Sequence, residues 1–362
     1  MNILSPDVYI HTLNPFAIHF TGSYGIRWYG LAYLAGFTIA YYTILFLAKR
    51  GLSFLKPELV SDFVFTAALG TVIGGRLGYC IFYSPELFLK FTSSIPFWGV
   101  LAINEGGMAS HGGIIGILVA CAWFGKKHNI PILHLFDLTT LGGTAGIFFG
   151  RIANFVNGEL VGRPVESSVP WAVKFPQDIM AWPIQDPERL GTLGNVVTKI
   201  GVPNENWQSA ISKMRMNDSS WGFVQHTLAR LVEAVQSGNA SVTEALAPLL
   251  TARHPSQLYE ALLEGAFLFI SLVFLWRKPL KPGVIAGSFF VLYAIVRIIG
   301  EQFRMPDAQI GYQLLGLTRG QWLSIAMLAL GSIALFVWQR RNTAPIGGWC
   351  ASSVKLPLKE NV

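Results

Sequence analysis

Residues 135–163 read LFDLTTLGGTAGIFFGRIANFVNGELVGR, an apolar run that ends in polar and charged side chains. The apolar part, residues 135–155, is long enough to cross a bilayer as a helix, which takes about 20 mostly apolar residues. Arg151, Asn154 and Glu159 then follow where this predicted helix ends. A guanidinium group at membrane level is costly unless an anionic or hydrogen-bonding partner receives it. The stretch therefore predicts a membrane helix whose end binds an anionic group such as a lipid phosphate.

The composition of the whole chain also indicates a membrane protein. The chain has 362 residues, of which 52% are hydrophobic and 13% are charged, whereas soluble domains carry about a quarter charged residues. Its 37 glycines suit close packing between helices in a bilayer. The net charge of +7 comes from short basic clusters between apolar runs. No basic face is interleaved with aromatic residues, so nucleic acid is not an expected partner.

Seven apolar segments are candidate membrane-spanning helices. They cover residues 28–48, 63–82, 111–124, 135–155, 258–276, 283–299 and 322–338. The third is short unless residues 108–113 extend it. The predicted fold class is an all-α polytopic membrane protein with about seven transmembrane helices.

The basic clusters predict the orientation of these helices. The clusters are Lys49-Arg50 with Lys56, Lys126-Lys127, Arg277-Lys278 with Lys281, and Arg340-Arg341. They follow the first, third, fifth and seventh helices, so they share one side, which the positive-inside rule makes cytoplasmic. The N-terminus is then outside and the C-terminus is in the cytoplasm.

Four regions follow from this topology. Residues 1–156 hold the N-terminal segment and the first four helices, and residues 256–341 hold the last three. Residues 157–255 form a folded insert outside the cytoplasm between the fourth and fifth helices, with some helix near residues 223–236. Residues 342–362 are a cytoplasmic tail. Within the first region, residues 1–25 mix aromatic and polar residues and indicate a loop or an amphipathic segment.

The outer arginines need a reason other than topology, because the positive-inside rule does not place them there. They are Arg27, Arg76, Arg151, Arg297 and Arg304. Two of them share a pattern, since Asp62 precedes Arg76 by the same spacing as Asp137 precedes Arg151. Both helices also carry glycines four residues apart. A shared packing requirement and an ancient duplication both explain this repeat.

Two groups of residues could bind an anion at this level. Arg151, Asn154 and Gly158 share one face if the fourth helix continues; alternatively, Arg–Glu and Asn–backbone bonds simply close the bundle there. Tyr293, Arg297, Glu301 and Arg304 form a stripe on the sixth helix. The plainer interpretation of this stripe is a self-satisfied Arg297–Glu301 pair.

Three further groups have competing interpretations. His111 lies among the glycines of residues 104–113 and could take a proton from a thiol, although a helix-end histidine is more often a structural hydrogen-bonding group. Gln257, Glu260 and Glu264 share a face by spacing, and a capped helix start with a polar packing stripe is favoured for most of them. Tyr29 fits an interfacial aromatic belt, or its hydroxyl could point inward.

Several chemistries lack their motifs. The chain has no HExxH, GxSxG or Walker A sequence and no paired aspartates suited to hold magnesium near a diphosphate. Metal-dependent phosphotransfer, nucleotide hydrolysis and serine proteolysis are therefore disfavoured, and neither a metal nor a cofactor is expected. Cys80, Cys121 and Cys350 lack a CxxC spacing, so buried small hydrophobic residues are favoured over a disulfide, a metal site or a nucleophile.

Six segments together resemble the bacterial prolipoprotein diacylglyceryl transferase family. They are residues 26–30, 75–79, 111–113, 150–163, 254–260 and 297–307, in the family's order. Two departures stand out: Ala153 occupies a position where the family commonly has glycine, and the segment between Arg163 and His254 is longer than expected.

The resemblance implies a seven-helix enzyme of the bacterial inner membrane, with its active site toward the periplasm, its N-terminus and insert periplasmic, and no cofactor. Such an enzyme moves the diacylglyceryl group of phosphatidylglycerol to the lipobox cysteine thiol of a prolipoprotein, the first step of lipoprotein maturation. Its other product is glycerol phosphate. The expected partners are therefore phosphatidylglycerol and the signal peptide of a prolipoprotein.

Matching motif positions carry the family's functional residues onto this chain. The catalytic roles fall on His111, Arg151, Arg297 and Tyr29. The phosphatidylglycerol contacts fall on Arg151, Asn154, Glu159, Gly162, Arg297, Glu301 and Arg304. Arg163 also occupies a matching position.

Two other function classes compete with this transferase. A lipid or anion transporter, or a scramblase, with an arginine-lined path predicts charges at several depths of the bilayer, whereas the basic groups within the apolar runs gather near one face. A purely structural scaffold leaves His111 and Arg297 unexplained.

Overall fold

The computed structural model describes residues 8–21, 24–93, 95–103, 106–306 and 311–350. Residues 104 and 105 of the glycine-rich stretch, residue 307 at the end of the last family-like segment, and residues 351–362 of the predicted tail lie outside the described residues. The other regions named above are covered in whole or in large part.

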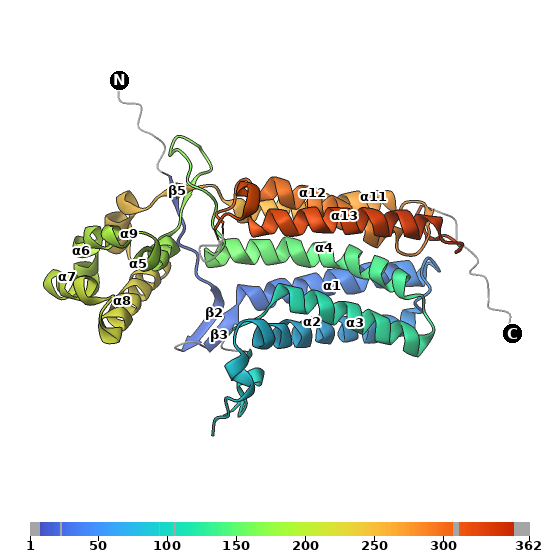
Figure 1. Cartoon of the computed structure of the whole chain (residues 1–362), viewed down its shortest axis with the longest axis horizontal. Coiled ribbons are helices and arrows are strands. Elements are labelled where there is room, and N and C mark those ends of the chain that lie inside the picture. The colour runs from blue at the N-terminus through green and yellow to red at the C-terminus, as the bar shows by residue number, and fades with distance from the viewer. Residues whose placement is uncertain (1–7, 22–23, 94, 104–105, 307–310, 351–362) are drawn as a thin grey trace. The chain divides into compact units, whose positions relative to one another are not determined.

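All seven predicted transmembrane segments coincide with helices (Figure 1). The helices are α1 (Trp28–Lys49), α2 (Val60–Phe82), α3 (Ser110–His128), α4 (Ile132–Asn157), the segment Ser256–Leu275, α12 (Val284–Gly300) and α13 (Arg319–Arg340). Among the described residues, five helical segments are long and apolar enough to cross a membrane. α12 is apolar but has 17 residues, and α3 has a histidine near its start and a Lys-Lys-His run at its end. The protein is therefore a mostly helical polytopic membrane protein.

The chain forms two compact units, which are described separately below. The first unit comprises Met1–Tyr33, Phe148–Glu264 and Ile295–Ile325, and the second comprises Leu34–Ile147, Gly265–Ala294 and Ala326–Val362.

The N-terminal part of the first unit contains strands where a loop or an amphipathic segment was predicted. Strand β2 (Phe16–Thr21) pairs antiparallel with β3 (Tyr24–Arg27). Phe16, Ile18 and Phe20 alternate with smaller or polar residues, a period that favours a strand over a helix. A second sheet has the order β1-β4-β5. Its strands are β1 (Tyr9–Ile10), β4 (Val173–Lys174) and β5 (Ala252–Arg253), with β1 parallel and β5 antiparallel to β4.

The insert is a small helical body with its own apolar core. Its longer helices are α7 (Asn204–Lys213), α8 (Asp218–Gln236) and α9 (Ala240–Leu246). The shorter pieces are η5 (Pro176–Ala181), α5 (Trp182–Gln185), η6 (Pro187–Leu193), α6 (Gly194–Val197), η7 (Thr198–Ile200) and η8 (Ala247–Leu249). Helix α8 confirms the helix predicted near residues 223–236, and it buries one face through Val224, Leu228, Leu231 and Val235. Asn217 and Asn239 cap α8 and α9 by accepting hydrogen bonds from Ser219 N and Val242 N.

In the second unit, α2 and α3 lie side by side with their backbones in contact (Figure 1). A Cβ atom added at Gly116 would lie 1.9 Å from the carbonyl oxygen of Gly70, and one added at Gly74 would lie 2.4 Å from that of Gly112. The glycine spacing seen in the sequence therefore serves close approach of these two helices. Cys80 and Cys121, one on each helix, are buried free thiols as predicted, whereas Cys350 is a free thiol that is exposed, so the prediction of burial was wrong for Cys350.

Arg76 of α2 is buried, and its guanidinium group donates hydrogen bonds to backbone carbonyls. Its guanidinium group reaches the oxygens of Gly99 at 2.7 Å, Val100 at 2.7 Å, Gly106 at 2.5 Å and Gly107 at 3.0 Å. These carbonyls belong to the connection between α2 and α3, which also holds η2 (Pro85–Phe88) and η3 (Gly99–Leu101). Arg76 therefore organises this connection.

The second unit also contains a helix start capped from another helix. Asp137 of α4 accepts hydrogen bonds from Gly283 N at 2.7 Å and Ala286 N at 2.8 Å, at the beginning of α12. A carboxylate at the beginning of a helix stabilises that helix. Nearby, β6 (Pro279–Leu280) pairs antiparallel with β7 (Ile346–Gly347).

Candidate active site

A buried network of arginine and glutamate side chains lies in the first unit. Its arginines are Arg151 of α4, Arg297 of α12 and Arg304, which follows α12. Its glutamates are Glu260, Glu264 and Glu301. These named residues carry three positive and three negative formal charges, so the arginine–glutamate network is neutral as a set.

Arg151 is held by two carboxylates. Its Nη1 lies 2.9 Å from Glu260 Oε2, and its Nη2 lies 2.8 Å from Glu264 Oε2. Its Nε also donates to Glu264 Oε2 at 3.2 Å. The planar guanidinium group thus meets Glu264 with two donors, a geometry that a lysine cannot reproduce.

Arg297 shares the same carboxylates. Its Nη1 donates to Glu264 Oε1 at 3.0 Å and to Glu260 Oε1, and its Nη2 lies 2.8 Å from Glu301 Oε2. Glu264 therefore bridges Arg151 and Arg297 through its two oxygens. The predicted Arg297–Glu301 pair forms, but it is one contact of several, so Arg297 is not satisfied by that pair alone.

Arg304 joins the network at a longer distance. Its Nη1 lies 3.6 Å from Glu260 Oε1, which places Glu260 in contact with three arginines. The side chains of Glu260 and Glu264 are 0% exposed, against 15% for Arg151 and 13% for Arg297. The side chains of the two glutamates are thus more completely buried than those of the arginines that they contact.

The local fold explains how both glutamates reach the arginines. Glu260 ends α10 (Ser256–Glu260), and Glu264 lies in a π-helical turn, Ala261–Phe267, that precedes α11 (Leu268–Leu275). π-Helical turns inside helices are rare and are frequent at functional sites. The structure shows that Glu260 and Glu264 are buried ion-pair partners of the arginines; their interpretation as members of a polar packing stripe stays a prediction. The signal that could have identified them is a pair of carboxylates four residues apart within an apolar segment.

Glu301 is anchored to the start of α13. Its Oε1 accepts a hydrogen bond from Thr318 Oγ1 at 2.9 Å. Thr318 and Gln321 form a reciprocal capping box, in which Gln321 Oε1 accepts from Thr318 N at 2.9 Å and Thr318 Oγ1 accepts from Gln321 N at 3.2 Å. This cap fixes the position of Glu301 and hence of Arg297.

A second polar group adjoins the network on α4, one turn beyond Arg151. Tyr29 Oη donates to Glu159 Oε2 at 2.9 Å, and Asn154 Nδ2 donates to Tyr29 Oη. Asn157 Nδ2 donates to Glu159 Oε1 at 3.3 Å. The hydroxyl of Tyr29 is therefore held by the side chains of Asn154 and Glu159 at the end of α4, and we name these residues the tyrosine–glutamate cluster.

The loop after α4 is held by the beginning of α10. Gly158 leaves the helix with a φ of 67°, a value that favours glycine. Gln257 Nε2 then donates to Glu159 O at 2.6 Å, and Ser256 Oγ donates to Leu160 O at 3.1 Å. These bonds place Glu159 opposite Tyr29.

Gly162 lets the loop after α4 approach the backbone of His254 closely. A Cβ atom there would lie 2.2 Å from the carbonyl oxygen of His254, so no side chain fits. The residue pairs with Arg304 in an antiparallel bridge, and Arg163 Nε donates to Arg304 O at 3.0 Å. Gly162 therefore holds the backbone of Arg304 in register with the loop after α4.

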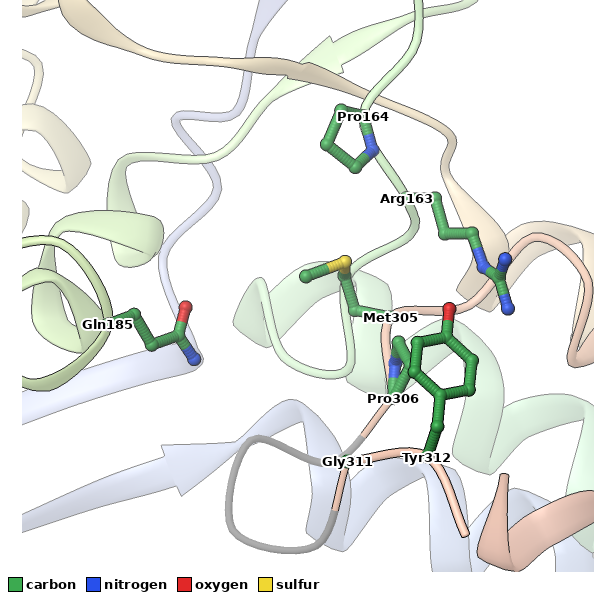
Figure 2. A pocket seen from close by; sticks show the side chains of 7 residues that line it. All are labelled: Arg163, Pro164, Gln185, Met305, Pro306, Gly311 and Tyr312. Atoms are coloured by element: carbon green, nitrogen blue, oxygen red, sulfur yellow. The ribbon is translucent and has the colours of Figure 1, made fainter. Parts of the chain in front are cut away.

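A cavity of about 390 Å³ opens beside this bridge (Figure 2). Its lining residues are Arg163, Pro164, Gln185, Met305, Pro306, Gly311 and Tyr312. The guanidinium carbon of Arg163 lies 5.9 Å from the ring centre of Tyr312. The cavity is mainly apolar in its lining, with Arg163 as its charged member.

Among the described residues of the first unit, two titratable side chains outside the membrane-spanning segments have a shifted pKa. Burial raises the pKa of Asp178, and the adjacent Arg253 guanidinium opposes this change. Arg253 also donates to Gly162 O at 3.2 Å. Burial lowers the pKa of His11, whose ring packs against Phe155 and Phe175.

The first unit brings together nearly all of the predicted site residues. They are Tyr29, Arg151, Asn154, Glu159, Gly162, Arg297, Glu301 and Arg304. His111 belongs to the second unit, where it is exposed in the first turn of α3. Its predicted position beside Arg151 remains a prediction.

Comparisons with known proteins show the family of the chain. A family model described as "LGT: Prolipoprotein diacylglyceryl transferase" matches residues 15–338. A phosphatidylglycerol–prolipoprotein diacylglyceryl transferase of Bdellovibrio bacteriovorus is 53% identical over 351 residues, which cover 97% of this chain and 100% of that protein. Proteins of the same name from Rhodospirillum centenum (37% identical, 92% of this chain and 94% of that protein) and Bradyrhizobium diazoefficiens (35% identical, 91% and 92%) are also similar. The chain belongs to the prolipoprotein diacylglyceryl transferase family.

Proposed function

We propose that the protein transfers the diacylglyceryl group of phosphatidylglycerol to the cysteine thiol of a prolipoprotein, the first step of lipoprotein maturation. The observation that carries this proposal is the pair of guanidinium groups of Arg151 and Arg297, bridged by Glu264 next to the tyrosine–glutamate cluster. Planar arginine forks suit a phosphate group. The names of the relatives give the same reaction.

The reaction is a displacement at carbon. The thiol sulfur forms a bond to the glycerol carbon that carries the phosphodiester, and the bond from that carbon to the phosphate oxygen breaks. The electron pair stays on the leaving oxygen, so glycerol phosphate gains negative charge, and the thiol proton passes to a base. Fixed donors at the phosphate stabilise this developing charge in the transition state more than in the bound lipid.

Each predicted site residue has a role in this scheme. Arg151 and Arg297 bind the phosphate, and Tyr29 and Asn154 orient its oxygens or those of the glyceryl group. Glu159 positions Tyr29, while Glu301, Arg304 and Gly162 shape the arginine–glutamate network. His111 assists deprotonation of the thiol, because the thiolate is the reactive nucleophile.

The proposal includes a location and a topology. The chain crosses the bacterial inner membrane seven times, with a periplasmic N-terminus and a cytoplasmic C-terminus. The insert of residues 157–255 is a periplasmic head, and the site opens toward the periplasm, where it meets the lipobox cysteine of the signal peptide. The basic clusters of the sequence support this orientation.

A direct assay tests the proposal. Purified protein is incubated with phosphatidylglycerol and a peptide that carries a lipobox cysteine, and the peptide is weighed by mass spectrometry. The expected result is a mass increase of one diacylglyceryl group on cysteine, with release of glycerol phosphate. Movement of lipid between leaflets without that increase would support a scramblase instead.

A further inference from the structure

The arginines of the proposed phosphate site already have anionic partners. Glu264 takes donors from both Arg151 and Arg297, and Glu260 contacts the same two arginines. An incoming phosphate needs the same N–H groups. Phosphate can therefore bind only to those molecules in which the carboxylates have released some of these N–H groups. Its apparent affinity is reduced in proportion to the fraction of such molecules.

The geometry makes this competition reversible. The glutamates are fully buried, whereas the arginines keep exposed fractions of 15% and 13%. An anion can thus reach the partly exposed arginine side chains, whereas the carboxylates that it displaces from them stay buried. A buried carboxylate without its partner is strongly disfavoured, so Glu260 and Glu264 regain the arginines when the anion leaves.

The reaction changes the charge of the phosphate group, and this change explains why competition from the carboxylates would aid turnover. The phosphodiester of the lipid carries one negative charge. The phosphate monoester of the product carries nearly two near neutral pH, since its second pKa is about 6. A clamp made of arginines alone would therefore hold the product more tightly than the substrate, and turnover would stop at release.

We propose that Glu264 and Glu260 are positioning residues that compete with phosphate for Arg151 and Arg297 and thereby expel the glycerol phosphate product. This inference rests on the proposed function and goes beyond it, because it assigns product release to two buried carboxylates that never touch the reacting atoms. They also hold the two guanidinium groups as a pair between turnovers.

The test compares Glu264→Gln and Glu260→Gln with the wild type. Glutamine keeps the size of the side chain and removes its charge, so the arginines hold an anion more firmly. The expected result is a fall of about tenfold in the inhibition constant of added glycerol phosphate, the effect of one charge-assisted contact. The KM for phosphatidylglycerol should fall with it, and kcat should fall because release becomes slow.

A matched control uses Glu233→Gln, the same change at an exposed residue of α8. It should leave the inhibition constant, KM and kcat unchanged. A purely structural role for Glu264 would lower thermal stability and the active fraction without tighter product inhibition. That result in both variants would overturn the inference.

Two measurements on the wild type keep this test decisive. If the wild type adds no mass to the lipobox peptide, the proposed function fails. If the wild type transfers the group but both glutamine variants fail to fold, the inference is tested by two constants of the wild type. These are the inhibition constant of glycerol phosphate and the KM for phosphatidylglycerol. Glycerol phosphate that inhibits the wild type well below the KM for phosphatidylglycerol would show that the product is not expelled, and the inference would be wrong.

Discussion

Arg76 of α2 and Arg151 of α4 occupy the same sequence pattern but have different partners. Arg76 donates to backbone carbonyls, whereas Arg151 donates to the carboxylate of Glu264 and forms an ion pair with that of Glu260. Carbonyls of a folded connection are fixed, so they hold Arg76 permanently. Carboxylates are anions, and another anion can exchange with them. The partners of an arginine therefore decide whether it is structural or available to a ligand.

The aspartates of the repeated pattern also differ. Asp137 is buried and caps the start of α12, while Asp62 is exposed in the first turn of its own helix. The shared spacing of aspartate and arginine thus marks where the two helices begin and end. It does not give the two aspartates or the two arginines the same role. Four variants test this comparison.

The largest effect is expected for Arg151→Lys. Lysine keeps the positive charge but loses the planar fork, so transfer should fall by about a hundredfold, the usual cost of one oriented donor. Thermal stability should change little. The measurement is the initial rate of diacylglyceryl transfer to a lipobox peptide. A rate near that of the wild type would remove Arg151 from the phosphate site.

Arg76→Lys should act on folding. A lysine satisfies fewer of the four carbonyls, so we expect a loss of about 3 kcal/mol in stability, from two charged hydrogen bonds. The transfer rate per folded molecule should fall less than for Arg151→Lys. Thermal unfolding in detergent measures the loss, with the exposed Arg341→Lys as control. Unchanged stability with abolished transfer would place Arg76 in the chemistry and break the comparison.

Gly116→Ala probes the helix pair that carries Arg76. The added methyl group would collide with the carbonyl of Gly70, and such overpacking costs about 2 kcal/mol. Gly143→Ala in α4 is the control, since nothing lies within 4 Å of a Cβ atom there and alanine favours a helix. Equal melting temperatures for the two variants would show that the contact between α2 and α3 relaxes freely.

His11 extends the comparison to a buried group that can titrate. Because burial lowers its pKa, the folded protein binds fewer protons than the unfolded chain as the pH falls below about 6.5. Stability is therefore present above that pH and decreases on acidification, by about 1.4 kcal/mol per unit of pKa change. Melting temperatures between neutral and acidic pH should fall less steeply for His11→Gln. Parallel curves for the variant and the wild type would contradict this role.

The sequence was sufficient for the helices but not for their contacts. Apolar runs are local, so the spans of α1 and α4 could be read to within a few residues. The partners of Glu260 and Glu264 depend on which helices meet, and hydropathy carries no such information. The hairpin of β2 and β3 was missed because mixed aromatic and polar residues gave no clear period over the whole segment.

The residues of the candidate site could likewise be predicted from the sequence only in part. Arg151, Asn154 and Arg297 were predicted from charged groups at the ends of apolar runs and from the family resemblance. The π-helical turn around Glu264 has no sequence signal of its own, and the link from Thr318 to Glu301 joins segments that only the fold brings together. These contacts decide the charge balance of the site, which the sequence left open.

Gly162 has a consequence for genetics. Because any side chain there would strike the backbone of His254, substitutions at this position should inactivate the protein even though glycine offers no reactive group. A screen for loss of function would rank Gly162 beside Arg151 and could not separate them. Loss of function on mutation in this loop therefore has two causes, a steric clash or the loss of a reactive group. Only a kinetic measurement on folded protein distinguishes them.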